Sequence, residues 1–192
     1  MKKAILIIVW LAGVSQLNAQ VSSDSLKIRK NIIKTDVAGF LLSTVYHLNV
    51  SWEHLLSKKA SIETGFYFYK PDDVINFRDF ELGAEMMYRK YFNRNNSQMK
   101  GFYLAPYTQF RWKYRNYDGY YYHLYNYDNI YIDAGLQTGY QWVIKKKWTI
   151  DFYLKAGINL FNNKPVYTNN YYYHSNPVDI IWGGGLKIGY KF

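Results

Sequence analysis

The chain has 192 residues, which is the size of a single domain. It has no cysteine, which excludes disulfides, thiolate metal sites and cysteine nucleophiles, and its composition of 20% charged and 49% hydrophobic residues excludes general disorder. The net charge is +10, and 22 Tyr, 11 Phe and 6 Trp give an aromatic content typical of strands and membrane interfaces.

Residues 1–19 have the three-part layout of a secretory signal. Lys2 and Lys3 are basic, residues 4–14 are apolar, and residues 15–19 are small or polar up to Ala19. A membrane-spanning helix needs roughly 20 apolar residues, and this run is about half as long. We therefore expect cleavage after Ala19 rather than anchoring by a helix, and we expect residues 20–29 to lie in the periplasm.

Alternation of apolar and polar residues with a period of two predicts eight β-strands. In chain order these segments are 34–42, 47–53, 61–68, 80–89, 102–114, 130–144, 148–160 and 180–192. In the last four segments the even-numbered positions carry no charge, whereas the odd-numbered positions include Arg111, Lys155 and Lys187. The two faces of the first segment are hard to distinguish. An even number of strands is typical of bacterial membrane barrels.

The predicted connections alternate in length. The short connections are 55–59, 93–100 and 145–147. The longer or more irregular connections are 70–76, 115–128 and 162–178. Outer-membrane barrels have short periplasmic turns and long external loops, so this alternation assigns the two ends of the barrel. The connection at 43–45 is an exception, because it would be external and very short.

Two features favour a membrane barrel over a soluble, lipocalin-like barrel, in which the apolar face would point inward. Glycines concentrate on the polar face, as in Gly83, Gly139 and Gly185, where a crowded lumen needs small residues. Aromatic residues of the apolar face gather at both ends of the strands, as girdles at the two membrane interfaces would. We therefore expect the apolar face to contact lipid.

Four short motifs lie at the ends of predicted strands: NIIKTD at 31–36, VSWE at 50–53, GFYLAPY at 101–107 and YKF at 190–192. With these motifs, residues 30–192 resemble the small outer-membrane barrels of the OmpA/OmpX type, and in particular a bacterial family recorded as a domain of unknown function. The resemblance implies an all-β, eight-stranded antiparallel up-and-down transmembrane β-barrel that is integral to the bacterial outer membrane.

The interior of an eight-stranded barrel is only wide enough for its own side chains. Six carboxylates and six cations occupy the predicted inward face, so we expect ion pairs to fill the lumen. A narrow polar channel is the alternative. The inward charges are Glu53, Glu63, Glu81, Glu85, Asp133 and Asp151, with Arg89, Arg111, Lys113, Lys155, Lys187 and Lys191.

The sequence predicts no catalytic residue, no cofactor and no metal site. Glu81 and Glu85 would lie about 13 Å apart on one strand face, which is too far for a coupled acid–base pair. The histidines, including His123 and His174, form no close metal pair.

We therefore expect a non-enzymatic protein. The alternative is a lipid-modifying barrel of the lipid A deacylase or acyltransferase type. His47 and Ser51 lie four residues apart on a polar strand face and are the candidate pair for such an enzyme, but the residues around them do not match its motifs.

Tyrosines crowd two of the predicted external connections. Tyrosine gives large, stiff contact area at recognition surfaces, so these connections are a candidate binding surface for another envelope protein or a surface glycan. The alternative is that strands extend beyond the bilayer and stack their tyrosines for stability. The residues are Tyr117, Tyr120, Tyr121, Tyr122, Tyr125, Tyr127, Tyr167, Tyr171, Tyr172 and Tyr173.

The expected partners also include outer-membrane lipid. Nucleic acid is not expected, because the chain is predicted to be exported. The largest basic cluster, residues 145–147, is a predicted turn whose lysines would be solvated or contact phosphate headgroups.

Overall fold

The computed structural model describes residues 30–37, 46–70, 80–92, 99–119, 122–162 and 179–192. For residues 46–47, 115–119 and 122–127 the description is limited to the backbone. The predicted secretory signal (1–19) and the predicted periplasmic segment (20–29) lie outside the described residues. Within the described part of the chain, no helix is long and apolar enough to span a membrane.

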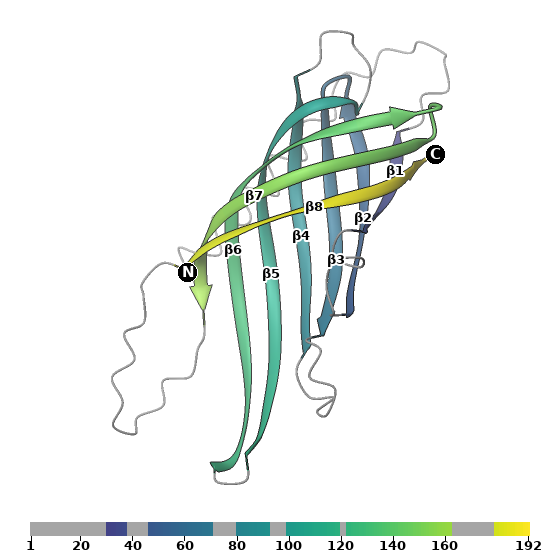
Figure 1. Ribbon diagram of the computed structural model, residues 1–192. Coiled ribbons are helices and arrows are strands. Elements are labelled where there is room, and N and C mark those ends of the chain that lie inside the picture. The colour runs from purple at the N-terminus through teal and green to yellow at the C-terminus, as the bar shows by residue number, and fades with distance from the viewer. Residues whose placement is uncertain (1–29, 38–45, 71–79, 93–98, 120–121, 163–178) are drawn as a thin grey trace.

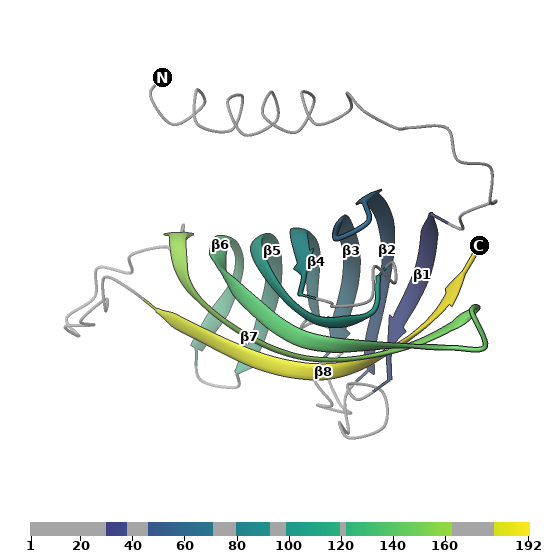
Figure 2. The ribbon, with the colours of Figure 1, turned by 90° about the horizontal axis from the view of Figure 1, so that it is seen from above.

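The described residues form one closed, antiparallel β-barrel (Figures 1 and 2). Its eight strands follow each other in sequence order, and β8 pairs with β1 to close the sheet. The strands are β1 (Asn31–Asp36), β2 (Tyr46–Ser57), β3 (Ala60–Lys70), β4 (Phe80–Tyr91), β5 (Gly101–Gly119), β6 (Tyr122–Ile144), β7 (Trp148–Asn162) and β8 (Ile180–Lys191). The prediction of an eight-stranded up-and-down barrel is confirmed.

The first strand begins earlier than the predicted segment 34–42. Ile32 already pairs with Glu53 of β2 on one side and with Lys191 of β8 on the other. Two neighbouring strands therefore hold this short segment extended, and the periodicity of its own sequence does not decide where it begins.

The connection predicted over residues 115–128 is instead a paired ribbon, and that prediction was wrong. The pairing continues from Arg115↔Tyr127 to Gly119↔Tyr122, although β4 last pairs with β5 at Tyr114 and β7 reaches β6 only as far as Tyr131. Among the described residues, 115–119 and 122–127 thus pair only with each other, and they are here called the distal ribbon. Tyrosine-rich segments favour extended backbone, which explains why the strands continue beyond the barrel wall.

The distal ribbon defines one end of the barrel, here called the distal end. The opposite, proximal end carries the β2–β3 turn, the β6–β7 turn and the C-terminus (Figure 1).

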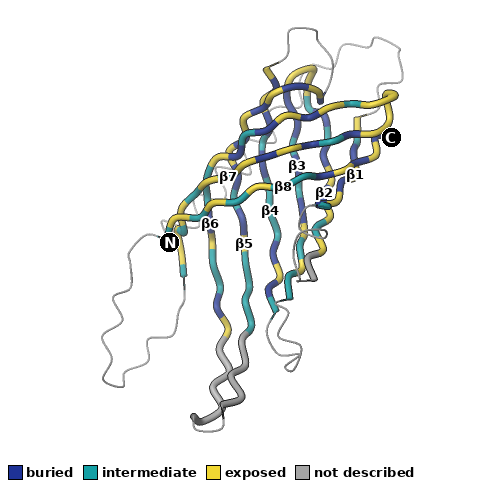
Figure 3. Tube along the Cα trace, viewed as in Figure 1, coloured by how far each residue is buried: buried dark blue, intermediate teal, exposed yellow. Residues whose placement is uncertain are grey.

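Side chains alternate between the two faces of the barrel wall as predicted (Figure 3). Phe152 and Leu154 are 47% and 54% exposed on the outside, whereas Lys187 is 1% exposed inside. A soluble barrel would show the opposite arrangement, with its apolar side chains packed together in the interior. An apolar exterior on a closed sheet suits hydrocarbon, which offers no partners to open backbone groups.

Aromatic rings concentrate at both ends of this apolar exterior. At the proximal end, the rings of Trp148 and Tyr190 meet edge to face at 5.3 Å. At the distal end, Phe80 meets Trp112 edge to face and stacks on Tyr114, with ring centroids 5.4 Å apart in both pairs. Strands β2, β4 and β8 are each 12 residues long, which is enough for a tilted strand to span a bilayer.

A closed barrel of this kind should resist unfolding by detergent at room temperature. We expect unboiled protein extracted from membranes to migrate differently on a denaturing gel from boiled protein, because only heating opens the sheet. Identical migration of the two samples would contradict a stable closed barrel.

Candidate functional site

Six charged side chains meet inside the proximal half of the barrel, and none of them is more than 1% exposed. Each occupies an inward position on a different strand. The set comprises three cations and three carboxylates and is called the proximal ion cluster: Lys34, Arg89 and Lys187 with Glu53, Glu63 and Asp151.

Lys34 on β1 joins all three carboxylates of this cluster. Its Nζ lies 2.6 Å from Glu53 Oε2 and 3.0 Å from both Glu63 Oε2 and Asp151 Oδ2. A lone buried ammonium would be very costly, and three carboxylates at these distances offset that cost.

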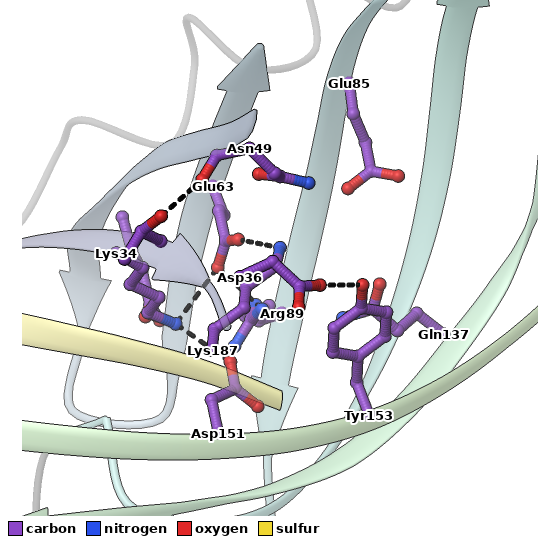
Figure 4. A network of polar contacts seen from close by, with 12 residues as sticks. Lys34, Asp36, Asn49, Glu63, Glu85, Arg89, Gln137, Asp151, Tyr153 and Lys187 are labelled. Carbon is purple, nitrogen blue, oxygen red and sulfur yellow. Dashed lines mark hydrogen bonds and ion pairs between the residues drawn. The ribbon is translucent and has the colours of Figure 1, made fainter. Parts of the chain in front are cut away.

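Arg89 on β4 makes a second set of ion pairs, to two of these carboxylates (Figure 4). Its two terminal nitrogens lie 2.6 Å from Glu63 Oε2 and from Asp151 Oδ2. The guanidinium carbon also lies 4.2 Å from the ring centroid of Tyr103, within range of a cation–π interaction. Lys187 completes the pairing, with its Nζ 2.7 Å from Glu63 Oε1.

Neutral side chains complete the network and extend it to the remaining two strands. Tyr103 on β5 donates to Asp151 at 2.9 Å, and Gln141 on β6 accepts from Lys34 at 2.6 Å. Tyr91 donates to Glu53 at 2.5 Å, and Ser61 donates to the same Glu53 oxygen. Every one of the eight strands therefore contributes a side chain to one continuous polar network.

A second group of six charges fills the distal half of the lumen. Arg111 Nε lies 2.5 Å from Asp133 Oδ2, and Lys155 Nζ lies 2.8 Å from Glu85 Oε2. The side chains of Arg111, Lys113 and Lys155 are 22%, 23% and 19% exposed, so this half of the lumen is more open than the proximal half. The group is called the distal ion cluster: Arg111, Lys113 and Lys155 with Glu81, Glu85 and Asp133.

Glycines that face the lumen make room for tyrosines on the neighbouring strand. This agrees with the prediction that a crowded lumen needs small residues. Gly83 is the register partner of Tyr67, and a Cβ on Gly83 would lie 2.1 Å from that ring. Gly139 is the partner of Tyr103, and a Cβ there would lie 2.6 Å from the tyrosine oxygen. The rings thus occupy the space that a side chain on the next strand would need.

All twelve charges predicted to face inward are buried or partly buried in the lumen, including Lys191 near the proximal rim. Two inward charges were missed, Lys34 and Asp36 of β1. Asp36 accepts a hydrogen bond of 2.7 Å from Tyr153. These two residues were missed because the even-numbered positions of the predicted segment 34–42 mix the charged Lys34 and Asp36 with the apolar Phe40 and Leu42, so the sequence shows no clearly polar face.

Glu81 and Glu85, the two carboxylates considered as an acid–base pair, bond to different partners. Glu81 accepts from Tyr67 at 3.0 Å, whereas Glu85 pairs with Lys155. No group of three or more potential metal ligands occurs among the described residues.

Several candidate residues are only partly covered by the description. Ser51 is buried in β2, while the side chain of His47 lies outside the described part, as do His123 (side chain) and His174. Tyr117, Tyr122, Tyr125 and Tyr127 lie in the distal ribbon, described by its backbone. The remaining candidate tyrosines lie outside the described residues: Tyr120, Tyr121, Tyr167, Tyr171, Tyr172 and Tyr173.

A closed sheet with an apolar exterior and paired charges inside defines a transmembrane β-barrel. The sequence matches the family described as "Protein of unknown function (DUF3575)" over residues 5–178, and the chain belongs to this family. The resemblance to such a family, drawn above from short motifs, is thereby confirmed.

No curated protein sequence matches the chain. Among solved structures, the chain is similar to the N-terminal β-barrel domain of Pseudomonas aeruginosa OprF, with 11% identity and a TM-score of 0.48. That match covers 85% of this chain and 98% of that chain.

Replacing Arg89 with Met should destabilise the barrel strongly. Two buried carboxylates would lose a cation at 2.6 Å, and breaking a buried pair in this way costs about 3–5 kcal/mol of unfolding free energy. Denaturant unfolding in vesicles of zwitterionic phosphatidylcholine, followed by tryptophan fluorescence, measures the loss.

The matched control is Lys90→Met, one residue further along β4 on the outer face, which should change the free energy of unfolding by less than about 0.5 kcal/mol. The double variant Arg89→Met/Glu63→Gln restores equal numbers of each charge and should recover part of the loss. Equal effects of Arg89→Met and Lys90→Met would contradict the role assigned to the proximal ion cluster.

Proposed function

We propose that the chain is a non-enzymatic, integral outer-membrane protein whose barrel has a sealed lumen and serves as a scaffold for binding at its distal end. A short periplasmic segment (20–29) would precede the barrel once the signal (1–19) is removed. The partner would be another envelope protein or a surface glycan that contacts the tyrosine-rich distal connections. The observation that carries this proposal is the combination of a filled lumen with a ribbon that projects beyond the barrel wall.

Insertion in an outer membrane is supported by the exterior of the barrel. Large apolar side chains stay exposed on every strand from β2 to β8, for example Phe66, Leu136 and Leu154. Water around so many apolar groups would be unfavourable, whereas hydrocarbon between two aromatic girdles accommodates them.

A sealed lumen is supported by the proximal ion cluster. Its side chains reach across the interior from six strands, and Tyr103 and Gln141 bond to them from the other two. Ions entering from the distal half, where the cations are partly exposed, would meet charges that already have partners at 2.6–3.0 Å.

Reconstituted protein should therefore show no stable single-channel conductance in planar lipid bilayers. The bilayer preparation is valid when a porin added afterwards gives its usual current steps. Reproducible current steps from the purified barrel alone would contradict the sealed lumen.

Partner binding is supported by the distal ribbon. Residues 115–119 extend roughly 17 Å beyond the last β4–β5 pair at the usual rise per residue. No other described strand pairs with the edges of this ribbon. A ribbon of two strands is marginally stable by itself, and its edges offer backbone groups to a partner. Its sequence carries the tyrosines and asparagines typical of recognition surfaces.

Shortening the ribbon should remove binding while keeping the barrel. Arg115 and Tyr127 are register partners, so replacing residues 116–126 with Asn-Gly closes the strands with a two-residue turn. The experiment places a photo-crosslinking residue at Tyr114 in the full-length and the shortened protein, in intact cells.

We expect a discrete crosslinked product with the full-length protein and none with the shortened protein, while both keep the heat-dependent gel shift. A crosslinker at Trp148, at the proximal rim, serves as the control for random contacts. Identical products from the full-length and shortened proteins would contradict binding by the ribbon. Altered mass of lipid A after incubation with purified protein would instead support the lipid-modifying alternative.

A further inference from the structure

Exposed lysines surround the proximal rim of the barrel. Lys58 and Lys59 form the β2–β3 turn, and the backbone N–H of Tyr91 donates to Lys59 O at 2.8 Å, which places Lys90 beside that turn. The β6–β7 turn adds three more lysines. These six residues are called the lysine collar: Lys58, Lys59, Lys90, Lys145, Lys146 and Lys147.

In the described part of the chain, no exposed Asp or Glu side chain offsets the positive charge of the lysine collar. The acidic residues of the proximal half, Glu53, Glu63 and Asp151, are fully buried in the lumen and engaged with its cations. Asp128 is exposed and Asp179 is partly exposed, and both lie at the distal end, at the base of the ribbon and just before β8. The surface charge of the described part is therefore polarised along the barrel axis, with its cations concentrated at the proximal rim.

The β6–β7 turn has lysines at two positions whose backbone conformation favours Asn and Gly. Lys145 and Lys146 have φ values of 48° and 61°, and the N–H of Lys147 donates to Ile144 O at 3.1 Å. Successive positive φ values are typical of a type I′ turn, which strongly favours Asn-Gly. Strain that persists in a native turn points to a role for the side chains that cause it.

The collar also lies at the edge of the lipid-facing surface. Lys147 directly precedes Trp148, whose ring packs against Tyr190 in the proximal girdle. Lys90 is exposed on the outer face of β4, two residues before the exposed Phe92. Aromatic girdles mark the depth of the lipid headgroups, so these ammonium groups lie at the depth of the lipid phosphates.

We propose that the lysine collar binds the headgroups of anionic phospholipids in the membrane leaflet that surrounds the proximal rim. In the described part of the chain no exposed Asp or Glu side chain lies beside these cations, so the collar complements a negatively charged headgroup layer. The inference goes beyond the proposed function, because it depends on membrane insertion and not on a partner at the distal end.

The test measures which lipid lies next to the proximal rim. Protein purified from membranes after removal of the signal, with Trp112 and Trp182 replaced by Phe, is reconstituted into vesicles so that Trp52, Trp142 and Trp148 remain as reporters. Brominated phosphatidylglycerol or brominated phosphatidylcholine then quenches their fluorescence in mixed bilayers.

We expect phosphatidylglycerol to be enriched about five-fold per contacted lysine at low salt, the factor expected for one cation near an anionic surface. High salt should abolish most of the enrichment. Inorganic phosphate at millimolar concentration, at constant ionic strength, should leave it unchanged. Loss of the enrichment with inorganic phosphate would mean that the collar binds free phosphate and would overturn the proposal.

The decisive variant is Lys145→Asn/Lys146→Gly. It removes two collar charges and supplies the residues that the turn prefers, so the barrel should be at least as stable while the lipid preference falls. Lys145→Arg/Lys146→Arg keeps the charge and should keep the preference. Lys70→Gln removes a charge at the distal end of β3 and should change nothing.

An unchanged preference in the Asn-Gly variant, or an equal loss in the distal control, would overturn the proposal. Equal quenching by both lipids with the unaltered collar would overturn it while leaving membrane insertion intact. Absence of quenching by either lipid would overturn both this proposal and the membrane location of the barrel.

Discussion

The pairing of charges inside a narrow, closed sheet is the constraint on which the rest of this structure depends. Hydrocarbon gives backbone groups no partners, so the sheet must close, and closing eight strands leaves an interior filled by side chains. Polar residues there must satisfy each other. The proximal ion cluster meets this requirement with three cations and three carboxylates from six strands, and Tyr103 and Gln141 bond to it from the other two. Because every strand contributes to this network, the charges find their partners only when the sheet is closed.

The two ends of the barrel differ in ways that follow from this core. The distal half of the lumen is more open, and two strands continue past their neighbours as a ribbon. The proximal half of the lumen holds fully buried ion pairs, and the described surface around it carries exposed lysines without exposed Asp or Glu side chains. A rigid, filled barrel can hold these two surfaces at opposite faces of a membrane. Binding at one end and lipid contact at the other are thus compatible with a single small scaffold.

Most of the strands and their two faces could be predicted from the sequence, because alternation with a period of two distinguishes outward, apolar side chains from inward, polar ones. The strands from β2 onward and all twelve predicted inward charges were found in this way. The pattern failed at β1, because the predicted segment 34–42 mixes charged and apolar residues at its even-numbered positions. It therefore missed Lys34, the residue that joins all three carboxylates of the proximal ion cluster. It also failed at residues 115–128, because tyrosine-rich strands beyond the bilayer need no apolar face. Pairing partners across the barrel depend on register, which no single segment encodes.

The direction of the apolar face is best tested by nuclear magnetic resonance of methyl-labelled protein in lipid nanodiscs, which requires no substitution. The account predicts magnetisation transfer from lipid acyl chains to the methyl groups of Leu136, Leu154 and Ile188, which are exposed on the outer surface. It predicts no such transfer to Ile32, which is fully buried in the lumen. Transfer to Ile32 together with none to Leu136 and Leu154 would show that the barrel carries its apolar face inside and would contradict the account.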